Sequence, residues 1–235
     1  GRFRSLQNYV PSINVVNNVI ATSTGARNLG VFFDRHLDMR QHILNTCRIC
    51  YFQLRQLRAI CHHLSKDVLK TLLHAFVSTR LDYCNSLLYG LPQCDMRKLQ
   101  SVQNAAARLI GGLRKYDHIT ILTRDMLHWL PIKQRINFKI AVLTYKALHQ
   151  QAPCYITSMC HLASDSSGLI CHRSATNSEL IPASWNSVFY GKRSFYYAAP
   201  KVWNSLPVFT RHQNSLAAFF TKDLKTVLFN QAYFA

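Results

Sequence analysis

Acidic residues are scarce in this chain. Asp and Glu total ten against 28 Lys and Arg, and Glu179 is the only glutamate. Two-metal phosphoryl transfer needs at least two convergent carboxylates to hold the cations. The aspartates are instead isolated along the chain, as at Asp34, Asp38, Asp82 and Asp125. The sequence therefore contains no candidate set for carboxylate-based catalysis.

Long apolar runs and catalytic motifs are also missing. No apolar run approaches the ~20 residues that a membrane-spanning helix needs, so we expect no membrane partner. The nucleophile motif G-x-S-x-G, the Walker loop and the dinucleotide motif G-x-G-x-x-G are absent. These absences leave binding, rather than catalysis, as the function that the residues themselves can support.

A framework of paired cysteines for zinc is missing too. Cys47 and Cys50 fall on the apolar face of a predicted helix, where cysteine behaves as a small hydrophobic residue. The pairs Cys160-His161 and Cys171-His172 are the better zinc candidate, and we keep a small zinc module as a minor alternative. We interpret the eight cysteines as reduced thiols of an intracellular protein.

What the chain has in excess is positive charge. Its formal net charge is +18 over 235 residues, and 49% of the residues are hydrophobic, which is enough for a substantial core. Such a field favours a polyanionic partner, with nucleic acid ahead of an anionic membrane surface. The chain begins at Gly1 and its first element looks like the middle of a larger unit, so we expect a fragment of a longer polypeptide.

Hydrophobic periodicity predicts a mainly α-helical fold. The β-branched and aromatic runs 13–21 and 27–33, separated by 22–25, predict two short strands joined by a turn. Gly30 suggests a bulge or a close backbone approach in the second strand. From Met39 the period becomes helical. After Pro153 the chain is looser, with loops over 161–187 and a final helix of about 18 residues from Asn214.

Capping signals divide the helical part. They predict one helix that starts after Ser65 and continues towards Leu88, a second capped by Asp95 and ended by Gly111-Gly112, and a third that starts at Pro131. The apolar stripe of the final helix is predicted to be Leu216, Phe220, Leu224, Val227 and Leu228.

The third helix carries a strip of cations. Arg135, Lys139 and Lys146 cluster within about 40° on a helical wheel. This strip lies between two apolar groups, which are Ile132, Ile136, Ile140, Leu143 and Ala147 on one side and Phe138, Val142 and Tyr145 on the other. Such cations can neutralise phosphates without reading base sequence. Alternatively, their long side chains extend to solvent from a helix that is packed on two sides.

Two further basic segments complete the candidate interface. Arg48 and Arg55 share a strip beside the apolar face of the first predicted helix. Residues 192–203 interleave cations with aromatic rings, which suits stacking or tracking of a nucleic-acid backbone, with Trp203 expected in the core. The predicted nucleic-acid-binding residues are Arg48, Arg55, Arg135, Lys139, Lys146, Lys192 and Arg193, and no catalytic or metal-binding residue is predicted.

Several short motifs occur in one order and resemble a known family. They are NLGVFFDRHLDMRQHI (28–43), RLDYCNSLLYGLP (80–92), LQSVQNAAARLI (99–110), HIT…LHWLPIKQRINFK (118–139), YKALHQQAP (145–153), AAPKVWNSLP (198–207) and FFTKDLKTVLF (219–229). Over roughly residues 15–233 the chain is similar to the C-terminal third of the reverse transcriptase of LINE-type, jockey-like non-LTR retrotransposons. The first eleven residues and the stretch 154–172 depart from the family pattern.

The resemblance implies a domain organisation. Residues 1–38 would be the end of the polymerase palm, with 28–31 on its last hairpin. Residues 39–153 would form a helical, thumb-like domain, and 154–235 a C-terminal extension with loops and a terminal helix. The catalytic aspartates of the family lie upstream of the matched region, so this chain would be inactive alone.

The resemblance also implies function and partners. The chain would be a fragment of an RNA-directed DNA polymerase that binds an RNA and DNA template–primer duplex through backbone phosphates. It would act in the nucleus, beside the palm and fingers of the same polypeptide. We expect no cofactor in this chain, whereas the parent polymerase would use Mg. The alternative is a decayed or domesticated remnant that serves as a helical interaction module without a nucleic-acid role.

Overall fold

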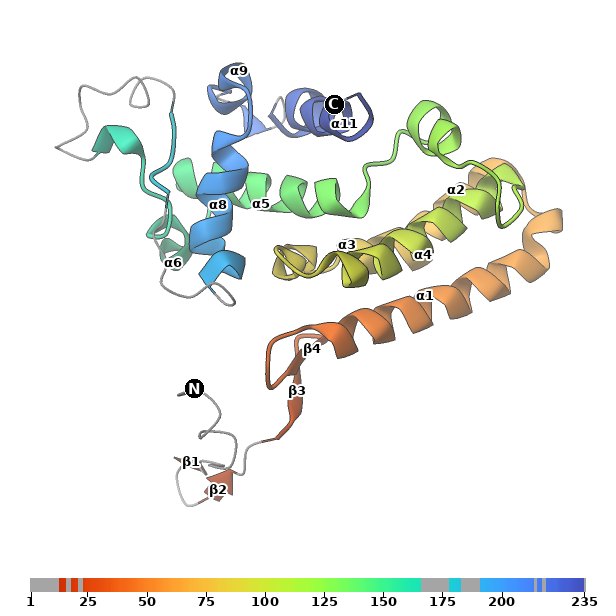
Figure 1. Ribbon diagram of the computed structural model, residues 1–235, viewed down its shortest axis with the longest axis horizontal. Helices are drawn as coiled ribbons and strands as arrows, with labels where there is room; N and C mark the ends of the chain where they lie inside the picture. Colours follow the sequence, from red (N-terminus) through yellow and green to blue (C-terminus); the bar gives the residue numbers. More distant parts are fainter. Residues whose placement is uncertain are drawn as a thin grey trace. The chain divides into compact units, whose positions relative to one another are not determined.

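The fold is mainly helical, with short antiparallel strands near the N-terminus, as predicted (Figure 1). It is given by a computed structural model that describes residues 13–15, 18–20, 23–165, 178–182, 191–213, 215–216 and 219–234. The chain divides into two compact units, Gly1–Asn45 and Thr46–Ala235. Within the described ranges, no helix is both long enough and apolar enough to cross a membrane.

The first unit contains two hairpins instead of one. β1 (Ile13–Val15) pairs with β2 (Asn18–Ile20), and β3 (Gly25–Asn28) pairs with β4 (Val31–Asp34), both antiparallel. The predicted pairing of run 13–21 with run 27–33 is therefore wrong. The first run forms the β1–β2 hairpin by itself, and the second run forms the β3–β4 hairpin.

A tight turn between β3 and β4 lets the run 27–33 form a hairpin of its own. Leu29 has a φ of 46° and Gly30 a φ of 83°. Two consecutive residues with positive φ form the tight hairpin turn whose twist matches that of the flanking strands. Gly30 is thus a turn residue, and the predicted bulge is wrong. The carboxylate of Asp34 then accepts the backbone N–H of Met39 at 3.0 Å, just before the first helix.

Helix α1 (Arg40–Ile60) begins in the first unit and continues into the second. The helical elements that follow include α2 (Lys66–Leu73), η3 (His74–Ser78), α3 (Thr79–Asp82), η4 (Asn85–Leu88), α4 (Gln93–Gly111), η5 (Leu122–Met126), α5 (Ile132–Leu148), α6 (Cys154–Thr157), η7 (Gly191–Arg193), α8 (Phe195–Asn204), α9 (Val208–Arg211), η8 (Phe219–Leu224) and α11 (Lys225–Tyr233).

Two of the predicted helix boundaries are confirmed. The Ser65 hydroxyl accepts the backbone N–H of Val68 at 3.4 Å, at the start of α2. Gly112 has a φ of 62° and donates its N–H to the carbonyl of Arg108, which ends α4. A left-handed residue of this kind satisfies carbonyls that the helix end would otherwise leave unpaired.

Two other boundaries differ from the prediction. The helix after Ser65 ends at Asp82 and not near Leu88, because Cys84 adopts a left-handed φ of 50° and a short 3-10 turn follows. α4 begins at Gln93, so Asp95 lies inside its first turn and does not cap it. There the buried Asp95 carboxylate accepts a hydrogen bond from the ammonium of Lys98, with 2.7 Å between Oδ1 and Nζ.

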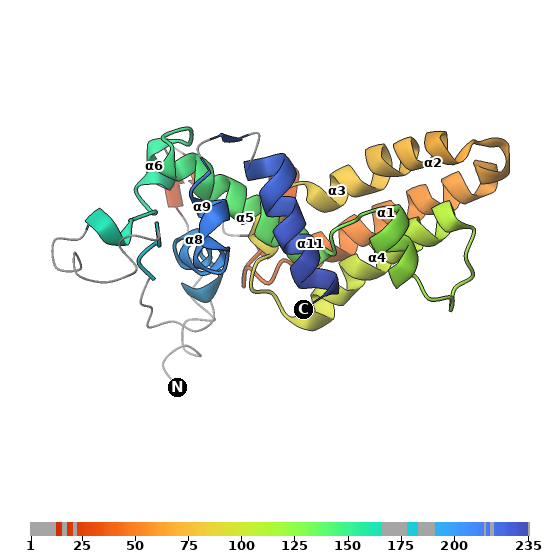
Figure 2. The ribbon, with the colours of Figure 1, turned by 90° about the horizontal axis from the view of Figure 1, so that it is seen from above.

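α5 is the central helix of the second unit, and most of its predicted stripe is buried. Ile132, Ile136 and Ile140 are each 3% exposed or less, whereas Leu143 is half-buried. α4, α8 and α11 all pack on α5. α8 crosses α5 in Figure 1, and Figure 2 shows α11 passing obliquely across α5. Val142 and Tyr145 are buried as well, so this helix is covered on two sides, as predicted.

An aromatic cluster joins α5 to the C-terminal elements. The ring of Phe219 stacks on that of Tyr145, with 4.4 Å between centroids, and lies 5.8 Å from that of Trp203. All three side chains are at most 1% exposed, and the core position predicted for Trp203 is confirmed. The indole N–H of Trp203 donates to the carbonyl of Ser178 at 2.9 Å.

The final helix does not follow one continuous stripe. Leu224 and Leu228 are buried as predicted, but Val227 is half-buried and the fully buried aromatic is Phe219, which the predicted stripe omits. Residues Phe219–Leu224 form a π-helical segment. A π turn inserts a residue into the helical repeat, so the register of buried positions changes across it. The side chain of Phe220 lies outside the described residues.

Candidate functional site

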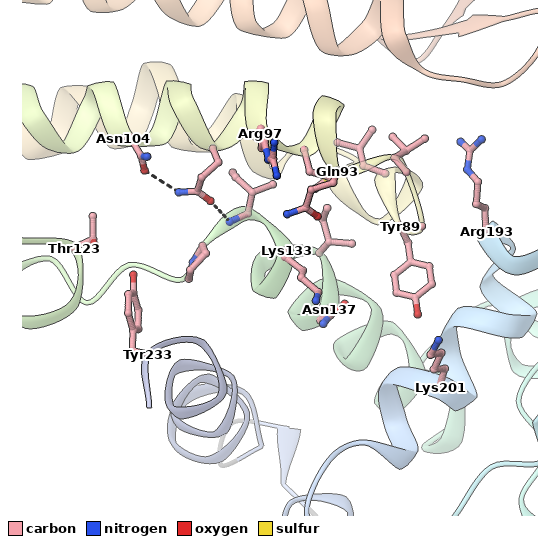
Figure 3. A pocket seen from close by; sticks show the side chains of 18 of the residues that line it. Tyr89, Gln93, Arg97, Asn104, Thr123, Lys133, Asn137, Arg193, Lys201 and Tyr233 are labelled. Carbon is pink, nitrogen blue, oxygen red and sulfur yellow. Dashed lines mark hydrogen bonds between the residues drawn. The ribbon is translucent and has the colours of Figure 1, made fainter. Parts of the chain in front are cut away.

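A cleft of about 720 Å³ opens in the second unit (Figure 3). Its walls come from α4, α5, η7 and α8, and from Tyr233 at the end of α11. Tyr233 is fixed there because its hydroxyl donates to the carbonyl of Trp129 at 2.8 Å. The site is thus assembled from segments that are far apart in the sequence.

α4 contributes a polar stripe to the cleft. Gln93, Arg97, Gln100 and Asn104 line it, and their spacing of four, three and four residues places them on one face of the helix. The Gln100 side-chain amide donates to Asn104 at 2.9 Å, and its oxygen accepts the backbone N–H of Ile132 at 2.9 Å. The stripe therefore also secures the first turn of α5.

We expect Gln100→Leu to lower the free energy of unfolding by about 1 kcal/mol, the usual cost of removing a helix cap. The change would leave the N–H of Ile132 without its acceptor at the start of α5. Chemical denaturation followed by circular dichroism measures the effect. Gln56→Leu, on an exposed position of α1, serves as the matched control and should change stability little.

α5 and α8 each contribute two polar side chains to the cleft. Lys133 and Asn137 on α5, and Tyr197 and Lys201 on α8, are each four residues apart and therefore share a helix face. The ammonium of Lys201 lies 5.6 Å from the centroid of the Tyr197 ring, within range of a cation–π interaction. Figure 3 shows the phenol of Tyr89 directed toward Lys201.

Gly90 allows η7 to approach the cleft. Its φ is 72°, and a Cβ at this position would lie 3.0 Å from Cγ of Arg193. A larger residue would be strained in this conformation and would also press on the Arg193 side chain. Lys192 and Arg193 consequently lie on the cleft wall beside Tyr89.

The charged side chains that line the cleft are all positive. Five cationic side chains line it: Arg97, Lys133, Lys192, Arg193 and Lys201. The lining residues, all within the described part of the chain, include no aspartate or glutamate. Concave sites lined by one sign of charge concentrate counter-ions, so the cleft suits an anionic ligand.

The uncharged lining residues can both stack and donate hydrogen bonds. Burial, and then the neighbouring phenol of Tyr197, raise the pKa of Tyr89 above its ordinary value. The Tyr89 phenol is therefore neutral at physiological pH and retains its O–H donor. Asn137 and Asn104 add side-chain amides that are half-buried.

Of the seven predicted binding residues, two lie in this cleft, namely Lys192 and Arg193. Arg135 has a different role. Its Nη1 donates to the Asp82 carboxylate at 2.7 Å, its Nε donates to the Leu130 carbonyl at 2.9 Å, and its side chain is only 15% exposed. These contacts tie α5 to α3, so the guanidinium is occupied within the protein.

The other predicted cations lie outside the cleft. Lys139 lines a second, smaller cleft of about 400 Å³ that Asp82 and Arg135 also line. Lys146 is half-buried on α5, whereas Arg48 and Arg55 are exposed on α1. The structure does not bring these four residues together with Lys192 and Arg193.

Arg97, Lys133 and Lys201 line the cleft but are not among the seven predicted binding residues, although Lys201 belongs to the segment 192–203 whose cations and aromatic rings were predicted to contact nucleic acid. On α5 the predicted edge was that of Arg135, Lys139 and Lys146, while the cleft uses the opposite edge of the isoleucine stripe, where Lys133 lies. A signal was present: polar side chains repeat at helical spacing on three segments. The sequence does not reveal that these three stripes face one another.

The cysteines behave as the sequence predicted on α1. Cys47 and Cys50 are buried, and burial raises the pKa of Cys50 to about 11. Such a thiol stays protonated near neutral pH and packs as an apolar group. Among the described residues, no group of three or more potential metal ligands lies together. Cys171 and His172 of the alternative zinc cluster lie outside the described residues.

Comparisons with protein-family models, with curated proteins and with solved structures found no match to this chain.

Proposed function

We propose that this chain binds nucleic acid through its backbone phosphates, as part of the reverse transcriptase of a LINE-type, jockey-like non-LTR retrotransposon. The observation that supports this proposal best is the cleft with five cations and no carboxylate. Cations of this kind neutralise phosphates and release counter-ions without regard to base sequence.

The exposure of these cations supports the same function. Arg97, Lys133, Lys192 and Lys201 are exposed and can reach phosphates at the rim of the cleft. Arg48 and Arg55, seven residues apart on the solvent side of α1, supply further contacts for a long ligand. The template–primer duplex of the parent polymerase has the required charge and length, and such a protein acts in the nucleus.

The test is the salt dependence of binding. The triple variant Lys133→Gln, Lys192→Gln and Lys201→Gln should bind a DNA or RNA–DNA duplex more weakly. The slope of log K against log salt should become shallower by roughly 2–3, since each phosphate contact contributes about 0.9 on a B-form duplex. Fluorescence anisotropy over a salt series measures both quantities.

A matched variant controls for charge alone. Lys66→Gln, Arg114→Gln and Lys115→Gln remove three exposed cations outside the cleft. If both triple variants change the slope equally, the cleft is not the binding site. If the unaltered chain shows no salt-dependent binding, the alternative of a remnant with a protein-interaction role replaces the proposal.

The proposal assigns no polymerase activity to this chain. Its carboxylates are scattered, and those on described residues are engaged with cations or backbone at several places, as at Asp34, Asp82 and Asp95. The chemistry of the parent enzyme, including its Mg, belongs to the palm, and this chain would bind the template and primer.

A further inference from the structure

The size of the cleft limits which part of a nucleic acid can enter it. A volume of about 720 Å³ lies within the range of small-molecule sites. A duplex is far larger, because its major groove alone, about 12 Å wide, admits an α-helix. A duplex can therefore contact only the rim of this cleft, whereas an unpaired nucleotide fits inside.

The lining side chains differ in exposure in a way that suits a nucleotide. Four of the five cations, Arg97, Lys133, Lys192 and Lys201, are exposed, whereas Arg193 and the uncharged Tyr89, Asn137 and Tyr197 are half-buried. A nucleotide likewise carries its charge on exposed phosphates and offers a neutral base for burial. A purely phosphate-binding surface would not need aromatic rings and amides beside its cations.

The uncharged groups are those that recognise unpaired bases. Unpaired bases stack on aromatic rings and form hydrogen bonds along their exposed edges. Tyr89 and Tyr197 offer rings, and the neutral phenol of Tyr89 and the amide of Asn137 offer donors and acceptors. Gln100 donates to Asn104 and accepts the backbone N–H of Ile132, and these hydrogen bonds hold the opposite wall in place before any ligand binds.

Resting on the proposed function, we infer that the cleft binds an unpaired nucleotide of RNA or DNA next to the duplex, with its base among Tyr89, Asn137 and Tyr197 and its phosphates on the rim cations. The chain would thereby distinguish a duplex that carries a single-stranded extension from a blunt one. Shape and the presence of a base, rather than a particular base sequence, would determine this preference.

The experiment compares three labelled probes by fluorescence anisotropy at one salt concentration. They are a blunt duplex, the same duplex with a short unpaired extension, and that extended duplex with abasic residues in the extension. The base-containing extension should raise affinity about tenfold, as expected for one stacked base. The abasic extension should give little of this gain, because it carries phosphates but no rings.

Two variants locate the effect. Tyr89→Leu should reduce the ratio of extended to blunt affinity several-fold. Tyr155→Leu, at a 62% exposed position on α6, controls for loss of a surface phenol and should keep the ratio. Should Tyr89→Leu fail to fold, Asn137→Ala at a half-buried helical position tests the same prediction.

The outcomes separate this inference from the proposed function. Equal, salt-dependent affinity for blunt and extended probes would overturn the inference and leave backbone binding intact. A full gain from the abasic extension would also overturn it, since phosphates alone would explain the effect. Absence of salt-dependent binding to every probe would overturn both.

Discussion

Replacing Phe219 with alanine is expected to lower the free energy of unfolding by about 3–5 kcal/mol, the range for losing a fully buried aromatic ring. Phe219 is 0% exposed and lies between Tyr145 of α5 and Trp203 of α8. Its removal would leave a cavity where three elements meet. Urea denaturation monitored by tryptophan fluorescence measures the change directly, because Trp203 belongs to the cluster.

The control is another phenylalanine. Phe209 lies on the short helix α9 and is 60% exposed, so Phe209→Ala should change stability by less than about 1 kcal/mol. If the two variants were destabilised equally, the aromatic cluster would not be the contact that joins the C-terminal elements to α5. Loss of this contact should also weaken nucleic-acid binding, since α8 carries part of the cleft.

Arg135→Met is expected to lower the free energy of unfolding by about 2–3 kcal/mol, because the variant removes two hydrogen bonds made by a charged group. The Leu130 carbonyl would keep only its hydrogen bond from the Gln103 side-chain amide. The Asp82 carboxylate would lose its donor, although Asp82 is 41% exposed and recovers some hydration from water. Methionine preserves most of the apolar stem. Thermal and chemical denaturation measure the loss.

An exposed ion pair between an arginine and an aspartate provides the control for Arg135→Met. Arg124 and Asp125 form an ion pair at 2.6 Å with both side chains partly exposed, and pairs of this kind contribute little. Arg124→Met should therefore change the free energy of unfolding far less than Arg135→Met. If Arg135→Met altered the salt slope of nucleic-acid binding while leaving stability unchanged, our assignment of Arg135 to the fold would be wrong.

The helical pattern was predictable because local periodicity and capping govern it. The isoleucine stripe of α5, the Ser65 cap and the Gly112 stop all depend on residues within a few positions of one another. The wrong predictions of element boundaries and buried positions share one cause, which is backbone conformations that interrupt the helical or strand periodicity. Cys84 and Leu29 adopt left-handed φ values although neither is a glycine, and the π segment at 219–224 shifts the register.

The candidate site was only partly predictable, for a different reason. Charge and aromatic interleaving indicated Lys192 and Arg193, but nothing in the order of residues shows that α4, α5 and α8 converge. Nor does a helical wheel distinguish a cation that faces a ligand from one that, like Arg135, meets a carboxylate 53 residues away. Tertiary pairing decides that question.

The convergence of five cations on one cleft has a thermodynamic consequence. In the unfolded chain these charges are spread apart, so folding brings like charges together and works against their repulsion. An anion that fills the cleft relieves this repulsion and binds only the folded form, and it therefore shifts the folding equilibrium. Stability and occupancy are consequently linked, and we expect a polyanion that binds the cleft to raise the free energy of unfolding.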